Sequence, residues 1–101
     1  MQMCTARPQE KSITMQQLTY KDRLHKIEVD LDQILSINKA SKTVHVEPMI
    51  SISKLNDYLM SIGWMLPVVP ELDDLTIGGL IMGGGIETTS QKYGLFHCIC
   101  R

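Results

Sequence analysis

The chain has 101 residues, a formal net charge of −1 and three cysteines. This length suits one domain at most, and the near-neutral charge argues against sequence-independent binding of nucleic acid, which needs a basic surface. No apolar run reaches the ~18 residues of a membrane-spanning helix, and residues 1–7 lack the apolar centre of a secretory signal. We therefore expect a small globular domain with reduced thiols, since an odd cysteine count without an export signal argues against a disulfide framework.

The first half of the chain predicts short strands. From Lys26 to Leu31 apolar residues alternate with polar ones, which is the period of a half-buried strand. Ile34–Ile37 and Thr43–Glu47 then predict a hairpin around the polar turn Asn38–Lys42. Pro48 ends the second of these strands because proline has no N–H to donate.

A helix is predicted after the hairpin. Its apolar positions recur at intervals of three and four: Ile52, Leu55, Leu59 and Ile62. Ser51 or Ser53 serves as its N-cap, and Gly63 stands where a left-handed C-terminal residue belongs. The segment Trp64–Pro70 contains two prolines, which force an extended path outside any central strand.

The most informative feature is a glycine cluster. Five of the seven glycines lie between Gly78 and Gly85, although ordered glycine costs backbone entropy. Thr76–Met82 predicts a short helix. Asp74 and Thr76 are the two candidates for its N-cap, and of these we expect Asp74. A loop from Gly83 to Ser90 should follow, and then the start of a strand at Leu95–Ile99.

The glycines suggest contact with a ligand. Gly78 and Gly79 would let a pyrophosphate approach unpaired N–H groups at the helix start, where the helix dipole favours an anion. Gly83, Gly84 and Gly85 would permit positive φ and a close crossing by a flat ring system. A glycine-rich turn that merely packs tightly is the alternative, and the residues alone leave both open. The sequence contains no phosphate-loop motif. It also lacks a dinucleotide fingerprint, because Thr88 stands where that motif needs its third small residue.

Several motifs carry a family resemblance: Val46–Pro48, Ser61–Trp64, Leu66-Pro67, Pro70–Gly83 and Lys92–Phe96. They resemble the delta-24 sterol reductases, also called the diminuto or seladin group. These are flavoproteins of the vanillyl-alcohol oxidase superfamily with a PCMH-type FAD-binding domain. The resemblance extends weakly to residues 3–8, which look like a loop reaching the FAD pyrophosphate.

The resemblance implies an α+β fold, with residues 1–101 forming part of a PCMH-type FAD-binding domain built of short strands and one to two helices. A substrate or cap domain would be absent from this chain and would follow Arg101, so we expect the fragment alone to be inactive. The implied activity is reduction of a sterol side-chain double bond, with NADPH as electron donor through FAD. Family members are usually anchored in the endoplasmic reticulum membrane by a preceding segment, and this chain contains no such segment.

The cofactor-binding residues that the resemblance implies are Thr76, Ile77, Gly78, Gly79, Leu80, Gly83, Gly84, Gly85, Ile86, Glu87 and Thr88. FAD would bind non-covalently, because residues 4–14 contain no histidine to which it could be attached. Catalytic residues stay unassigned. No metal is expected, since the three histidines are isolated and Cys98 with Cys100 suits a pair of buried thiols on a strand.

Departures from the family pattern leave other functions open. Ala6 and the pair Gln9-Glu10 replace a glycine and a glycine-tryptophan pair of the first loop, and Gly84 replaces a common threonine. One alternative is a non-catalytic truncated remnant or interaction fragment. Another is part of a sugar or alcohol oxidase of the same superfamily.

Overall fold

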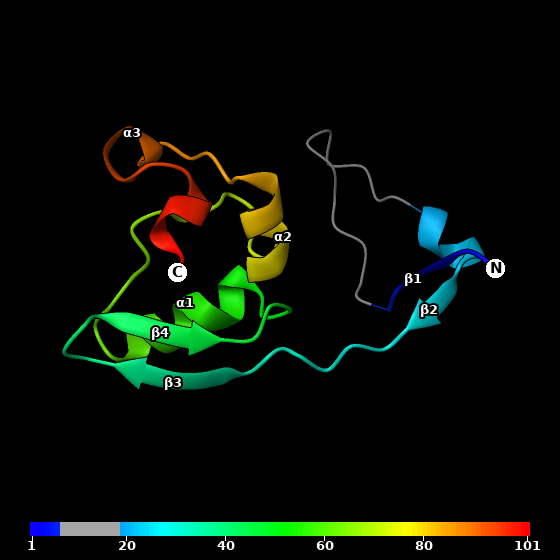
Figure 1. Cartoon of the computed structure of the whole chain (residues 1–101), viewed down its shortest axis with the longest axis horizontal. Helices are drawn as coiled ribbons and strands as arrows, with labels where there is room; N and C mark the ends of the chain where they lie inside the picture. The colour runs from blue at the N-terminus through cyan, green and yellow to red at the C-terminus, as the bar shows by residue number, and fades with distance from the viewer. Residues whose placement is uncertain (7–18) are drawn as a thin grey trace. The chain divides into compact units, whose positions relative to one another are not determined.

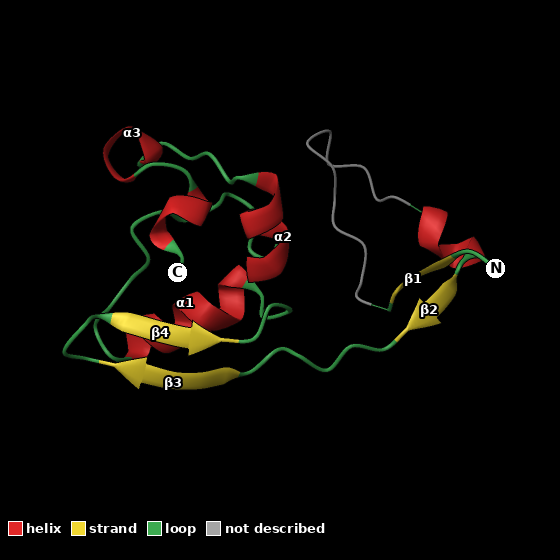
Figure 2. Ribbon diagram, viewed as in Figure 1, coloured by secondary structure: helices red, strands yellow, loops and turns green. Residues whose placement is uncertain are grey.

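The computed structural model describes residues 1–6 and 19–101. The chain divides into two compact units, Met1–Asp30 and Leu31–Arg101. Figure 1 traces the order of the elements, and Figure 2 separates helices from strands. Both kinds of element are short, so the fold is α+β as predicted.

The first unit is built around a parallel strand pair. β1 (Met3–Thr5) pairs with β2 (His25–Ile27), and the 3₁₀ helix η1 (Tyr20–Arg23) precedes β2. Lys21 of η1 donates from Nζ to the carbonyl oxygen of Thr5 at 3.1 Å. The predicted strand over Lys26–Leu31 is wrong beyond Ile27, because the pairing with β1 ends at Thr5 and Ile27 within the described residues.

The second unit begins with the predicted hairpin. β3 (Ile34–Asn38) and β4 (Thr43–Val46) are antiparallel, with an irregularity in register between Ile34 and Ser36. The side chain of Asn38 closes the turn, since its Oδ1 accepts from the N–H groups of Ala40 and Ser41. This side-chain contact is the typical role of asparagine in turns.

α1 (Ile52–Ser61) carries the centre of the core. Ser51 is its N-cap, with Oγ accepting from the N–H of Lys54 at 3.1 Å, and Gly63 takes the predicted left-handed conformation at φ 79°. The buried cluster of the unit consists of Ile50, Ile52, Leu55, Leu59, Val68, Ile77, Leu80 and Phe96. Four apolar side chains of β3 and β4 pack against this cluster, so the hairpin covers α1: Ile34, Ile37, Val44 and Val46. Each fully buried aliphatic side chain contributes roughly 1.5–3 kcal/mol.

Three short helices complete the unit: α2 (Ile77–Gly83), α3 (Ser90–Tyr93) and the 3₁₀ helix η2 (Phe96–Ile99). The strand predicted at Leu95–Ile99 is wrong, because no strand in the described part of the chain pairs with it and it buries one residue, Phe96, instead of an alternating face. The expected pair of buried thiols is also wrong, since Cys98 is exposed and Cys100 only partly buried.

Backbone hydrogen bonds join the starts of α1 and α2. The N–H of Ile52 donates to the carbonyl of Leu75 at 2.9 Å, and the N–H of Ile77 donates to the carbonyl of Ile50 at 3.1 Å. Ser51 and Thr76, the two N-cap residues, form an antiparallel bridge between these bonds. We call residues 48–53 and 73–78 the helix-start junction.

Candidate functional site

The glycine cluster begins at the first turn of α2. Thr76 is the N-cap, because its Oγ1 accepts from the N–H of Gly79 at 3.2 Å. The prediction that Asp74 caps this helix is therefore wrong. Thr76 stands directly before the first helical residue in extended conformation, with ψ 152°, which is the geometry that an N-cap requires.

The N–H groups of this turn are already engaged within the protein. Those of Ile77 and Gly78 donate to the carbonyls of Ile50 and Pro48, the latter at 2.8 Å. A Cβ on Gly78 would lie 3.1 Å from both Cβ and the carbonyl oxygen of Pro48, so glycine here permits tight packing. The expectation of unpaired N–H groups facing outward at the start of the helix is therefore wrong.

A side-chain-free stripe lies on the exposed side of α2. Gly79 and Gly83 are four residues apart, which places them on one helix face, and both are exposed. A Cβ built on Gly83 would meet no heavy atom within 4 Å. Met82 and Ile86 beside this stripe are 88% and 76% exposed. The result is bare backbone next to apolar side chains.

A left-handed turn follows α2. Gly84 and Gly85 have φ of 88° and 56°, as predicted, whereas Gly83 is helical. At Gly85 a Cβ would come within 2.6 Å of the Cβ of Phe96, and the carbonyl of Gly85 accepts from the N–H of Phe96 at 2.7 Å. Only glycine fits this position.

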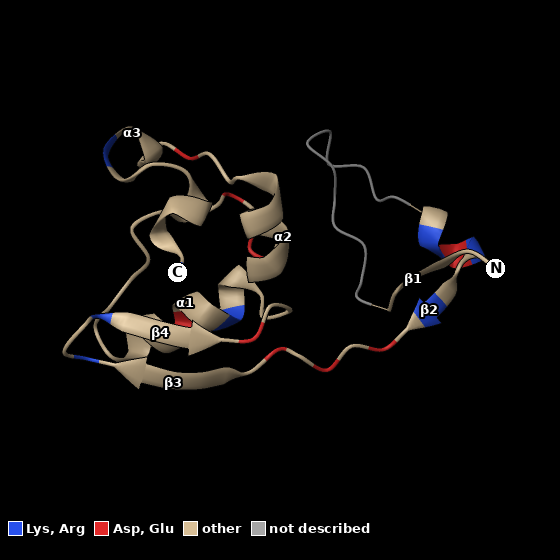
Figure 3. Cartoon of the chain, in the orientation of Figure 1, with Lys and Arg blue, Asp and Glu red and all other residues tan. Residues whose placement is uncertain are grey.

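The turn presents hydrogen-bond donors without acceptors. Among the residues that the structure describes, none accepts from the N–H of Gly85, Ile86 or Thr88. The N–H of Glu87 donates to Oγ of Ser90 at 2.9 Å. Residues 76–88 contain no lysine or arginine, and Glu87 is their one acidic residue (Figure 3). Any oxygen bound here would be held by neutral peptide groups and not by a counter-charge.

We call the side-chain-free stripe together with residues 84–88 the glycine face. It contains seven of the eleven predicted residues, whereas Thr76, Ile77 and Leu80 are buried and Gly78 packs against Pro48. Bare backbone, flanking apolar side chains and unpaired N–H donors fit a flat ring with carbonyl oxygens or a phosphate chain. The residues present therefore fit FAD. The upstream loop residues Arg7, Gln9 and Glu10 lie outside the described part of the chain.

A groove of about 550 Å³ lies on another side of α2. Its walls come from β4, α1, residues 64–67 and η2, and Ile77 is the one predicted site residue that lines it. Cys100 also lines it, and partial burial raises the pKa of this thiol. Sequence reasoning did not predict this groove. Ile77 and Ile81 line it at helical spacing, but the same spacing is equally typical of side chains in a hydrophobic core.

Within residues 1–6 and 19–101, no group of three metal-ligating side chains gathers at one place. No helix in this part of the chain is long and apolar enough to cross a membrane.

Residues 4–101 match the family model described as FAD binding domain, and the chain belongs to this family. It is 49% identical over 98 residues to the Delta(24)-sterol reductase of Rattus norvegicus and 48% identical to that of Homo sapiens. It is 44% identical over 99 residues to a Delta(24)-sterol reductase homolog of Caenorhabditis elegans. Each match covers 97% of this chain, which spans only 19% of the length of these relatives. No solved structure matches the chain.

Proposed function

We propose that this chain is the FAD-binding portion of a reductase that acts on a sterol side-chain double bond, with the glycine face against the flavin nucleotide. The observation that carries the proposal is the coincidence of bare backbone and unpaired donors in a chain of the FAD-binding family. The high identity to sterol reductases supports this function over a sugar or alcohol oxidase. NADPH as donor, a separate substrate domain and residence in the endoplasmic reticulum membrane belong to the same proposal for the whole protein.

FAD, when bound, supplies the hydride-transfer chemistry, and the residues of this chain bind and orient it. Gly79 and Gly83 let the cofactor approach the helix backbone, because no Cβ stands between them. The N–H groups of Gly85 and Ile86 donate to cofactor oxygens, and the side chain of Ile86 shields that contact from water. Of the set predicted from the sequence, Gly79 and Gly83–Thr88 would contact the cofactor, whereas Thr76, Ile77, Gly78 and Leu80 would support this surface from within the fold.

Gly83→Ala tests the proposal with little cost to the fold. The added methyl group meets no protein atom, and alanine is favoured over glycine in a helix, so the free chain should be slightly more stable. If the cofactor lies against this backbone, the dissociation constant for FAD should rise about tenfold or more, the factor that corresponds to ~1.4 kcal/mol. Gly79→Val is a poorer test, because a Cβ at Gly79 lies 3.0 Å from the capping Oγ1 of Thr76.

The measurement is a titration of the purified chain with FAD, followed by flavin fluorescence and by limited proteolysis with and without FAD. Bound ligand should slow proteolysis, because it stabilises the native state by mass action. Met60→Ala, an exposed change on α1, is the matched control and should leave FAD affinity unchanged. Proteolysis that proceeds equally fast with and without FAD would overturn the proposal and favour a non-catalytic remnant.

A further inference from the structure

η2 contacts the glycine turn through two consecutive residues. The N–H of Phe96 donates to the carbonyl oxygen of Gly85 at 2.7 Å. Nδ1 of His97 lies 3.4 Å from the carbonyl oxygen of Gly84. Phe96 is 2% exposed and belongs to the core, so this side of the turn rests on a fixed support.

These two contacts, together with the geometry of the peptide unit, determine where the N–H groups of Gly85 and Ile86 point. In a trans peptide unit the C=O and the following N–H point in opposite directions. The carbonyls of Gly84 and Gly85 point toward η2, so the N–H groups of Gly85 and Ile86 point away from it. These are the donors that no described residue satisfies.

The contact also defines the protonation of the His97 ring. A carbonyl oxygen only accepts, so the hydrogen bond to Gly84 requires the proton on Nδ1. In the neutral ring Nε2 is then the free acceptor, and Sγ of Cys98 lies 3.6 Å from it, within reach of a weak S–H donor. His97 therefore has a partner at each ring nitrogen.

We propose that His97 is a positioning residue for the flavin site: with Phe96, it holds the Gly84–Gly85 turn so that two N–H groups face the cofactor. This inference rests on the proposed FAD binding and adds the element that orients the donors. The ligand chemistry is an oxygen acceptor, which the flavin ring and the pyrophosphate both offer. Riboflavin and ADP, used as separate ligands, distinguish these two sources.

Three substitutions separate positioning from a merely structural role. His97→Leu removes the donor, and FAD affinity should fall about threefold to tenfold, the loss expected for one hydrogen bond. His97→Asn places its amide nitrogen at the same distance along the side chain as Nδ1, and it should restore affinity. His97→Gln places the nitrogen one bond further out and should not restore it. Met60→Ala, the exposed change on α1, is again the control and should leave affinity near the original value.

The readouts are dissociation constants for FAD, riboflavin and ADP, with the thermal midpoint of each variant as a check on folding. Rescue by asparagine but not by glutamine is expected. The affinities of the variants for either riboflavin or ADP should follow the same order as their affinities for FAD. Equal FAD affinity in the original chain and His97→Leu would overturn this inference while leaving the proposed function intact. Absence of FAD binding by the original chain would instead overturn the proposed function.

Discussion

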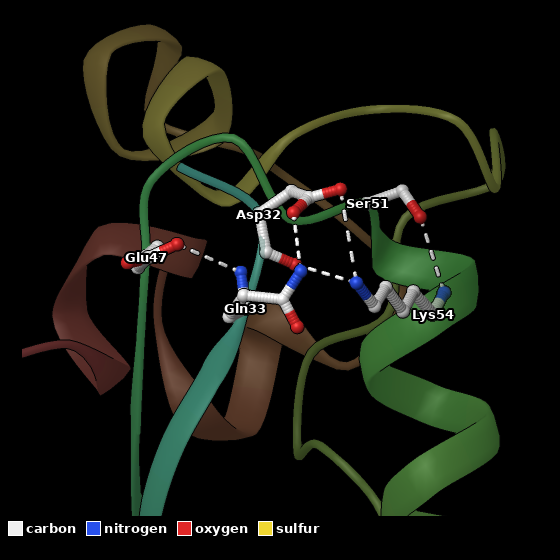
Figure 4. A network of polar contacts seen from close by, with 5 residues as sticks. All are labelled: Asp32, Gln33, Glu47, Ser51 and Lys54. Carbon is white, nitrogen blue, oxygen red and sulfur yellow. Dashed lines mark hydrogen bonds and ion pairs between the residues drawn. The ribbon is translucent and has the colours of Figure 1, made fainter. Parts of the chain in front are cut away.

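Gln33 and Glu47 exchange two hydrogen bonds, which extend the β3–β4 pairing one step beyond Ile34 and Val46. The N–H of Glu47 donates to the carbonyl of Gln33 at 2.9 Å. The N–H of Gln33 donates to the Glu47 carboxylate, also at 2.9 Å (Figure 4). Lys54 lies beside this pair and donates from Nζ to the carbonyl of Asp32 at 2.8 Å. The start of α1 is thereby tied to the chain that enters the hairpin.

Glu47→Ala removes the side-chain half of this exchange. Because the contact is exposed, the free energy of unfolding should fall by only about 0.5–1 kcal/mol. Glu47→Gln keeps an acceptor oxygen at the same position, so its free energy of unfolding should fall by less than that of Glu47→Ala. Urea unfolding followed by circular dichroism measures both variants, and an equal loss in the two would show that charge and not the hydrogen bond is responsible.

Ser51→Ala tests the cap of α1. Loss of the Ser51 acceptor leaves the N–H of Lys54 unpaired, and the free energy of unfolding should fall by about 1 kcal/mol. Ser53→Ala is the control, because Ser53 lies inside the helix and is not the cap, and it should be neutral or slightly stabilising. The same unfolding assay compares them, and a larger loss for Ser53→Ala would contradict the assignment of the cap.

Gly83→Ala and Gly85→Ala should change the free energy of unfolding in opposite directions. The first places its methyl group in open space and should stabilise the chain by about 0.5–1 kcal/mol. The second combines a positive φ with an approach of 2.6 Å to Cβ of Phe96, and it should destabilise by more than about 1 kcal/mol. Thermal unfolding at neutral pH measures the two changes, and similar stability of both variants would contradict the position of Phe96.

Cys100 should react with iodoacetamide only at higher pH in the folded chain than in the chain unfolded by urea. Burial disfavours the charged thiolate and raises the pKa of Cys100, and the thiolate is the reactive form. Peptide mass spectrometry after timed alkylation measures the modification of Cys100 in both states. The same shift stabilises the folded chain at pH below the ordinary thiol pKa, and this contribution is lost as pH rises through the raised pKa of Cys100. An equal midpoint for Cys100 in the folded and the unfolded chain would contradict its burial.

Local signals predicted the hairpin and α1 because both depend on residues close in sequence. The turn at Asn38 and the cap at Ser51 with its C-terminal Gly63 are contacts within a few residues. The strand expected at Leu95–Ile99 failed because alternation of apolar residues does not reveal whether a partner strand exists. Such partners are set by tertiary structure.

The glycine cluster was predicted as one ligand contact, but its members differ in role. Gly78 packs against Pro48, thirty positions earlier in the chain, and its N–H donates to the carbonyl there. Gly85 accommodates Phe96, whereas Gly83 faces open space. The spacing of the glycines does not predict the contacts of Gly78 and Gly85, because both depend on segments that folding brings together. The binding role therefore rests on the exposed side of α2 and on the turn after it.

The helix-start junction has a mechanical consequence. α1 and α2 share a backbone connection at their first residues, so the angle between their axes cannot open without breaking the bonds of Ile52 and Ile77. The far end of α2 leads into Gly84 and Gly85, two left-handed glycines whose carbonyls are held by His97 and Phe96. α2 is therefore fixed at both ends, so that a nucleotide bound against it would cost little conformational entropy.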